Sequence, residues 1–256
     1  MKYFGTALTD IGISKHTNQD SVCLKIVHSK EVGQVALMIV CDGMGGLQKG
    51  ELASATVITR LADWFDKELP LILKSATLEW IAGEWEQLIK RVNRQILDYG
   101  SENHVSLGTT LTAMLIMKEK YMIVHVGDSR IYRITEQVEQ LTEDQTVVAR
   151  EVRLGNMTLE EAEVDARRNM LLQCVGASRV VKPVFYYGNV CSNDIYIACS
   201  DGFRHMLSQK EIQEHFNAEK LQTKADMTEE GKKLIELVKR RNERDNISVA
   251  FIKCVE

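Results

Sequence analysis

The chain has 256 residues, of which 45% are hydrophobic and 27% charged, and its formal net charge is -4. This length suits one large domain or two small ones, and the composition is typical of a soluble globular protein. Such a charge creates no basic field over the whole surface, which argues against nucleic acid as a partner.

The N-terminal stretch MKYFGTALTDIG lacks the apolar core of a signal peptide, and no apolar run approaches the length of a membrane span. The cysteines are Cys23, Cys41, Cys174, Cys191, Cys199 and Cys254. They form no C-x-x-C pair, so we interpret them as reduced, buried small hydrophobes rather than metal or redox groups. We therefore expect a cytoplasmic protein without a membrane partner.

The first 45 residues are predicted to form strands, because two short apolar runs, 20–27 and 34–42, flank a polar break. The second run leads into VCDGMGG at residues 40–46. A phosphate-binding loop requires Gly-Lys-Ser/Thr, whereas this chain has Lys49-Gly50 in the reverse order. The dinucleotide-binding pattern fails as well, because Gln48 replaces its third glycine. Asp42 itself is therefore the feature to explain.

Two helices are predicted next. Apolar residues recur three or four apart from Leu52 to Leu69, and the same spacing returns from Leu78 to Tyr99. Tryptophan and leucine lie in these stripes, which indicates faces that pack on a core.

Strand patterns follow at 109–117, 121–129 and 130–134, with the spacing of an antiparallel meander. Further strands are predicted at 194–202 and 246–255. Helix starts are predicted at three pairs, Thr158 with Glu161, Ser208 with Glu211, and Asp226 with Glu229. This order of elements indicates an α+β fold in layers, with helices outside the sheets.

Five aspartates border the strongest predicted strands: Asp20, Asp42, Asp128, Asp201 and Asp245. Turn chemistry alone explains any single one of them, since Asp and Gly are favoured where strands end. Turn chemistry explains the five together less well, because carboxylates that converge repel one another unless protons or cations lie between them. Oxygen ligands without a Cys/His pair favour Mg²⁺ or Mn²⁺ over zinc. The pattern therefore predicts a two-metal hydrolytic centre at the strand ends.

An ordered series of segments resembles the metal-dependent protein phosphatase family (protein phosphatase 2C-like), in its short bacterial form. The segments are TDIGISKHTNQDSV, VCDGMGG, LGTTLTAML, VGDSRIYRI, LTEDQTVV, NMLLQCVGAS, ACSDGF and RDNISVAFI. Together they extend over nearly the whole chain. The resemblance implies a four-layer α-β-β-α sandwich of two antiparallel sheets flanked by helix pairs. It also implies a single catalytic domain over residues 1–256, with a flap-like segment at about 143–179.

The resemblance also assigns metal ligands. Asp42 matches the residue that bridges two Mn²⁺ or Mg²⁺ ions, and the carbonyl of Gly43 would complete the shell of one ion. Asp201 and Asp245 match carboxylates on the other ion. Asp20 matches the residue that usually holds metal-bound water.

Asp128 matches a ligand of a third, weaker metal site, which it would form with Asp201. In the implied reaction a hydroxide between the two principal ions attacks phosphorus, so Asp42, Asp201 and Asp245 are catalytic through the ions they hold. The implied substrates are phosphoserine and phosphothreonine in proteins that a serine/threonine kinase modifies, the kinase itself being a further candidate. The resemblance also implies that the protein is a monomer.

Two positions depart from the family's pattern. Lys15 stands where the family has an arginine that binds substrate phosphate; a lysine keeps the charge and loses the planar fork, so we expect weaker substrate binding. The alternative is that Lys15 is a solvated surface residue. Met44 stands where animal members have a histidine proposed to protonate the leaving group, so we expect solvent or metal-bound water to supply that proton.

Other interpretations remain open at the level of sequence. The arginines of the flap-like segment, Arg150, Arg153, Arg167 and Arg168, fit either a solvated helix surface or a phosphopeptide contact. The departure at Lys15 is the one feature that favours a catalytically weak pseudophosphatase, which would act as a phosphoprotein-binding regulatory module. A hydrolase of small phosphoesters is a further alternative.

Overall fold

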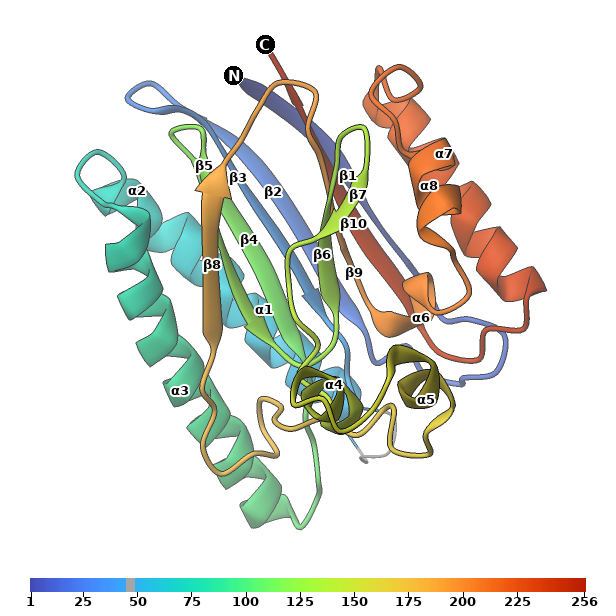
Figure 1. The fold of residues 1–256 in the computed structure, drawn as a ribbon. Coiled ribbons are helices and arrows are strands. Elements are labelled where there is room, and N and C mark those ends of the chain that lie inside the picture. Colours follow the sequence, from blue (N-terminus) through green and yellow to red (C-terminus); the bar gives the residue numbers. More distant parts are fainter. Residues whose placement is uncertain (45–48) are drawn as a thin grey trace.

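The computed structural model describes residues 1–44 and 49–256. The glycine cluster that the phosphate-loop comparison used, at residues 45 and 46, lies outside the described residues. Two five-stranded antiparallel sheets lie against each other, and helices cover the outer face of each (Figure 1). The predicted α-β-β-α sandwich is therefore confirmed.

The first sheet has the strand order β1-β10-β9-β6-β7, and the second has the order β2-β3-β4-β5-β8. The first sheet consists of β1 (Lys2–Asp10), β10 (Ile247–Val255), β9 (Ile195–Cys199), β6 (Arg130–Ile134) and β7 (Val138–Gln140). The second consists of β2 (Ser21–Ser29), β3 (Gly33–Cys41), β4 (Leu111–Met117), β5 (Lys120–Val126) and β8 (Val184–Asn189).

Helices α1 (Gly50–Lys67), α2 (Leu69–Ile72) and α3 (Leu78–Asn103) lie on the outer side of the second sheet. Helices α6 (Asp201–Arg204), α7 (Gln209–His215) and α8 (Lys224–Arg240) lie on the outer side of the first. Helices α4 (Val147–Arg153) and α5 (Leu159–Val164) project from one end of the sandwich and belong to the predicted flap.

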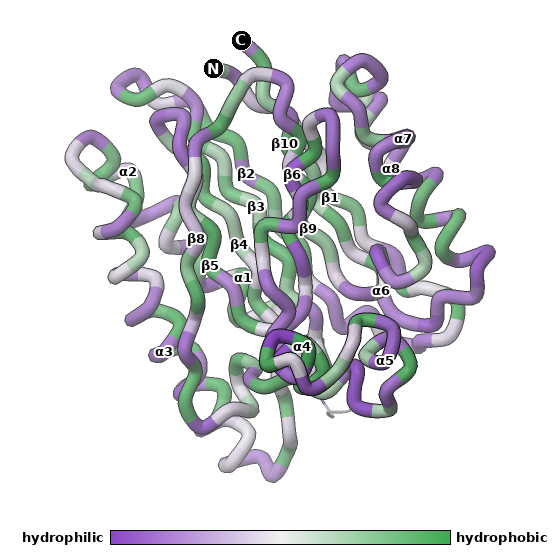
Figure 2. The backbone as a smooth tube through the Cα atoms, viewed as in Figure 1, coloured by the Kyte–Doolittle hydropathy of each residue, from purple (hydrophilic) through white to green (hydrophobic). Residues whose placement is uncertain are grey.

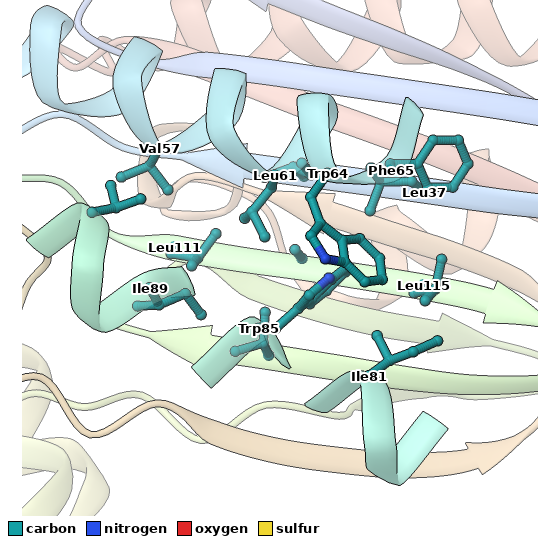
Figure 3. Close-up of a cluster of buried hydrophobic side chains, with 14 of the residues drawn as sticks. Leu37, Val57, Leu61, Trp64, Phe65, Ile81, Trp85, Ile89, Leu111 and Leu115 are labelled. Carbon is teal, nitrogen blue, oxygen red and sulfur yellow. The ribbon is translucent and has the colours of Figure 1, made fainter. Parts of the chain in front are cut away.

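Hydrophobic residues are concentrated along the strands, while the outer helices alternate between hydrophobic and hydrophilic positions (Figure 2). The buried apolar side chains form one cluster between the sheets and one beneath each helix layer. Beneath α1 and α3, Trp64 and Trp85 meet edge to face with ring centroids 5.7 Å apart (Figure 3). The predicted apolar stripes of both helices are thus core faces over most of their length, but Leu52 and Tyr99, at their ends, are exposed.

The predicted meander over 109–134 is wrong in its last step. β5 pairs with β4 and β8, whereas the following strand, β6, pairs with β9 and β7 in the other sheet. The chain changes sheets just after Gly127, whose φ of +111° is a conformation that L side chains rarely adopt. Spacing along the sequence cannot distinguish this crossing from a hairpin.

Two of the three predicted helix caps are confirmed, with Thr158–Glu161 and Ser208–Glu211 as capping boxes. The third pair is wrong, because α8 begins earlier: Thr223 is its N-cap, and Asp226 is the residue that bonds back to it. The edge strands β7 and β8 were not expected from the sequence.

All six cysteines are free, and four of them are buried. Cys191 is exposed and Cys23 half-buried, so the expectation of burial is wrong for these two. No helix among residues 1–44 and 49–256 is long and apolar enough to cross a membrane.

Candidate metal centre

The five predicted aspartates lie at one end of the sandwich. Asp20 precedes β2 and Asp42 follows β3, two strands that pair residue for residue up to this end. In the other sheet, Asp201 follows β9 and Asp245 precedes β10, which are also paired neighbours. Asp128 lies where the chain crosses from β5 to β6. Strand pairing therefore gathers carboxylates that are as much as 225 residues apart in the numbering, from Asp20 to Asp245.

Their charges act on one another. Burial raises the pKa of Asp42 well above its ordinary value, and the charges of Asp20, Asp201, Asp128 and Asp245 raise it further. Burial also raises the pKa of Asp20 to about 7, with added contributions from Asp201 and Asp245 and an opposing one from two serine hydroxyls. In the absence of cations these groups cannot all ionise together near neutral pH.

The backbone around Asp42 is fixed by two threonines. Its N–H donates to Thr110 Oγ1 at 2.9 Å, and its carbonyl accepts from Thr109 Oγ1 and from the Thr110 N–H, each at 2.9 Å. Packing is equally close at Gly43, where a Cβ would lie 2.4 Å from the carbonyl oxygen of Gln19. Only glycine allows the chain to pass this point without displacing the backbone beside it.

The donor set fits a hard cation. Asp20 Oδ2 and Asp201 Oδ1 are both buried, and neither has a hydrogen-bond partner among the described residues. Buried carboxylate oxygens without a donor are costly unless they are protonated or bind a cation, and Mg²⁺ and Mn²⁺ take such ligands. Within the described residues, no three acidic, histidine or cysteine side chains are placed so that they could hold a metal ion as they stand. An arriving ion would therefore have to draw these side chains together.

Lys15 lies in the centre rather than on the open surface. Its Nζ is 2.8 Å from Asp245 Oδ1, and 31% of its side chain is exposed. Burial lowers the pKa of Lys15, but the hydrogen bond and charge of Asp245, together with the charges of Asp42 and Asp201, outweigh burial and raise the pKa above its ordinary value. Lys15 thus supplies positive charge to the carboxylate cluster.

Residues that the sequence analysis did not single out complete the centre. The side chain of Asn246 ties two loops to the strand end: its Oδ1 accepts from the Gln19 N–H at 2.9 Å, and its Nδ2 donates to the Ile11 carbonyl at 2.9 Å. Its place directly after Asp245 was visible in the sequence, but these two partners depend on the fold.

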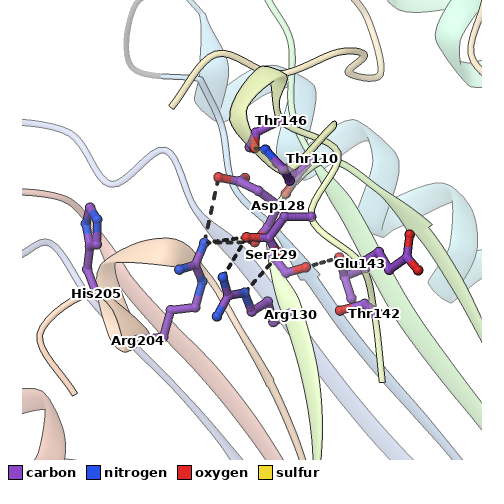
Figure 4. A network of polar contacts seen from close by, with 12 residues as sticks. Thr110, Asp128, Ser129, Arg130, Thr142, Glu143, Thr146, Arg204 and His205 are labelled. Carbon is purple, nitrogen blue, oxygen red and sulfur yellow. Dashed lines mark hydrogen bonds and ion pairs between the residues drawn. The ribbon is translucent and has the colours of Figure 1, made fainter. Parts of the chain in front are cut away.

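A second group surrounds Asp128 (Figure 4). Arg130 forms two hydrogen bonds to Asp144, of 2.7 and 2.6 Å, and Arg204 Nη2 lies 3.5 Å from Asp144 Oδ2. Arg204 Nη2 also donates to the Asp128 carbonyl at 3.3 Å. Burial raises the pKa of Asp128 to about 7; the charge of Asp201 adds to this, and that of Arg204 opposes it. Asp144 lies in LTEDQTVV, one of the segments that resemble the family, but the sequence analysis gave it no role, and it did not single out Arg204.

A cavity of about 1300 Å³ opens between the flap and this end of the sandwich. Asp128 and Asp201 line it together with Arg150, Arg153 and Arg168. Arg150 already pairs with its neighbour in sequence, Glu151, and Arg153 lies 3.5 Å from Glu143. Arg167 pairs with Asp165 and is not part of the cavity lining, so the surface interpretation holds for it.

The sequence profile of the protein phosphatase 2C family matches residues 13–244. Protein phosphatase PhpP of Streptococcus pneumoniae is 31% identical over 252 residues, which cover 97% of this chain and 96% of that protein.

Solved structures of serine/threonine phosphatases superpose on this chain over nearly its whole length. The serine/threonine phosphatase of S. agalactiae superposes with a TM-score of 0.84 at 32% identity, covering 99% of this chain and all of that one. The catalytic domain of the serine/threonine protein phosphatase PstP, solved in complex with two manganese ions, superposes with a TM-score of 0.78 at 29% identity and covers 99% of both chains.

Proposed function

The chain belongs to the protein phosphatase 2C family, and from this membership we infer that it is a Mn²⁺- or Mg²⁺-dependent serine/threonine protein phosphatase. We propose that its aspartate cluster is the two-metal centre. The observation that carries the assignment is the convergence of buried, mutually repelling carboxylates, two of which have an unpartnered oxygen. That arrangement is unfavourable without cations and suited to binding them.

The proposed ligands are the side chains of Asp20, Asp42, Asp201 and Asp245 and the carbonyl of Gly43. Asp42 would be the ligand shared by both ions, since the charges of the other aspartates all act on it. Two dications in such a centre supply an ionised water as nucleophile and neutralise charge on the phosphoryl oxygens.

The chain itself fixes the ligands and keeps the thiol beside Asp42 protonated. Hydrogen bonds from Thr109 and Thr110 hold the backbone of Asp42 in place. Cys41 is adjacent in sequence, but burial and the charges of Asp20 and Asp42 raise its pKa well above the ordinary thiol value. Cys41 therefore remains a protonated, buried thiol, and water is the nucleophile that this site can use.

Lys15 is proposed to bind the substrate phosphate. It is a cation within the centre, and once metal ions neutralise Asp245 its ammonium group is available to a phosphoryl oxygen. A lysine contributes charge without the two parallel hydrogen bonds of an arginine, so we expect substrate binding to be weaker than an arginine would give.

The remaining proposals concern the chain as a whole. We propose that residues 1–256 are one catalytic domain and that the flap at about 143–179 contacts the substrate protein over the cavity that it covers. The proposed partners are phosphorylated proteins, including the kinase that modifies them, and the proposed state is a cytoplasmic monomer that binds neither nucleic acid nor membrane.

The test is hydrolysis of a phosphothreonine peptide and of p-nitrophenyl phosphate with Mn²⁺, with Mg²⁺ and with EDTA. The wild-type chain is compared with Asp42→Asn and with Asp98→Asn, which removes an exposed carboxylate of α3 that pairs with Arg94. We expect metal-dependent turnover in the wild type and in Asp98→Asn, and a loss of at least about a thousandfold in Asp42→Asn.

Absence of turnover in a folded, metal-saturated wild-type chain would refute the enzymatic assignment and favour the phosphoprotein-binding module. Turnover of p-nitrophenyl phosphate without turnover of any phosphopeptide would favour a hydrolase of small phosphoesters. No observation in the structure favours either of these over the protein phosphatase.

A further inference from the structure

The carboxylate of Asp128 has a counter-ion built into the chain. Asp201 and Arg204 lie three residues apart on α6, so their side chains project from the same side of that turn. Arg204 is 13% exposed in its side chain, and its Nη2 is 3.9 Å from Asp128 Oδ2 and 3.3 Å from the Asp128 carbonyl. The guanidinium of Arg204 therefore lies beside the carboxylate of Asp128, at the same end of the sandwich as Asp201.

Two arginines, Arg130 and Arg204, lie beside Asp128 (Figure 4). They face the carboxylates of Asp128 and Asp144, and the charge of Asp201 also acts on Asp128. Asp144 is held by both arginines, and all four side chains are largely buried. A dication added beside Asp128 would meet the positive charge of Arg204 in a partly desolvated space, where like charges repel strongly.

The backbone around Asp128 leaves little freedom to move away from Arg204. Ser129, the next residue, bonds through its hydroxyl to Thr110 at 2.8 Å, and its carbonyl accepts from Thr112 Oγ1 at 3.1 Å. Gly127, the preceding residue, exchanges hydrogen bonds with Gln145: its N–H donates to Gln145 Oε1 at 3.0 Å, and its carbonyl accepts from the Gln145 N–H at 2.8 Å. Both flanks of Asp128 are thus anchored.

We infer that Arg204 takes the charge-balancing position at Asp128, so that this chain binds two metal ions and forms no third site between Asp128 and Asp201. The residues present fit the two principal ions and do not fit the third, contrary to the expectation from the family's pattern. The inference rests on the proposed two-metal centre.

The experiment counts bound Mn²⁺ in the full-length chain, using the electron paramagnetic resonance signal of free Mn²⁺ up to about 10 mM. We expect two ions in the wild type and two in Asp128→Asn, with dissociation constants that differ by less than about threefold. Arg204→Ser removes the guanidinium and should bind a third ion, which the double variant Arg204→Ser/Asp128→Asn should lose. Arg204→Lys keeps a positive charge and should remain at two.

A third ion in the wild type that disappears in Asp128→Asn would overturn the inference, as would a count of two in folded Arg204→Ser. If Arg204→Ser does not fold, the comparison of the wild type with Asp128→Asn decides by itself. Failure of the proposed function is separately visible, because it would appear as fewer than two ions in the wild type and no effect of Asp42→Asn on their number.

Discussion

Replacing Asp20 by asparagine should stabilise the metal-free protein while damaging its metal centre. Asp20 is 8% exposed, and its pKa is raised from 3.8 to about 7, mainly by burial. One pH unit corresponds to about 1.4 kcal/mol, so the ionised side chain costs the folded, metal-free chain about 4 kcal/mol above pH 7. Neighbouring carboxylates take up protons in response, and we therefore expect a gain of about 2–4 kcal/mol in Asp20→Asn at pH 8.

The sign of the pH dependence follows from the direction of the shift. Between pH 4 and pH 7 the folded state holds a proton on Asp20 that the unfolded state has released, so the stability of the wild type falls as pH rises. Asparagine does not titrate. The advantage of Asp20→Asn should therefore be under about 2 kcal/mol at pH 5 and reach its full value at pH 8.

The assay is urea unfolding followed by circular dichroism in EDTA at pH 5 and pH 8, with Asp98→Asn as the matched control. Asp98 lies on the exposed side of α3, so its replacement should change stability by less than about 0.5 kcal/mol at either pH. In saturating Mn²⁺ the gain of Asp20→Asn should shrink or reverse, because the wild type then obtains binding energy from the metal. Equal stabilities of Asp20→Asn and wild type at pH 8 in EDTA would refute the reasoning.

Three further predictions test separate parts of the structure. Gly43→Ala should lower both the melting temperature and kcat, because its Cβ would come 2.4 Å from the Gln19 carbonyl oxygen; unchanged kcat and stability would contradict the close packing. Trp85→Ala should cost about 3–5 kcal/mol in urea unfolding, because this ring is fully buried, whereas Trp80→Ala, at a site that is 49% exposed, should cost less than about 1 kcal/mol. Lys15→Arg should lower KM for p-nitrophenyl phosphate by about threefold to tenfold with kcat within about twofold; a higher KM would argue against a phosphate contact.

Much of this protein can be predicted from local patterns. Residues 35–41 are an uninterrupted apolar run, and all of them are buried in β3. The caps at Thr158 and Ser208 depend on two side chains within one turn of helix, so three residues of spacing are enough to locate them. These features depend on neighbours in the chain, which is why the sequence alone reveals them.

The candidate site was predictable in part from the family resemblance rather than from local patterns. A single Asp-Gly pair such as Asp42-Gly43 has an ordinary explanation as a turn, and only the ordered set of segments indicated the family and its metal ligands. The sequence also located Lys15 as a departure from the family's pattern. That Lys15 lies 2.8 Å from Asp245 was not foreseeable, because the two are joined only through the packing of separate loops.

The sequence by itself determined the layered α+β class, most of the helix faces, and the five aspartates that border strands. Only the tertiary structure decided the crossing after Gly127, since sheet membership of β6 is set by its pairing with β9, a strand that begins 61 residues later at Ile195. The position of Arg204 beside Asp128 was decided in the same way. Periodicity and capping are short-range effects, whereas strand pairing and charge balance join residues that are distant along the chain and meet only when the sheets pack.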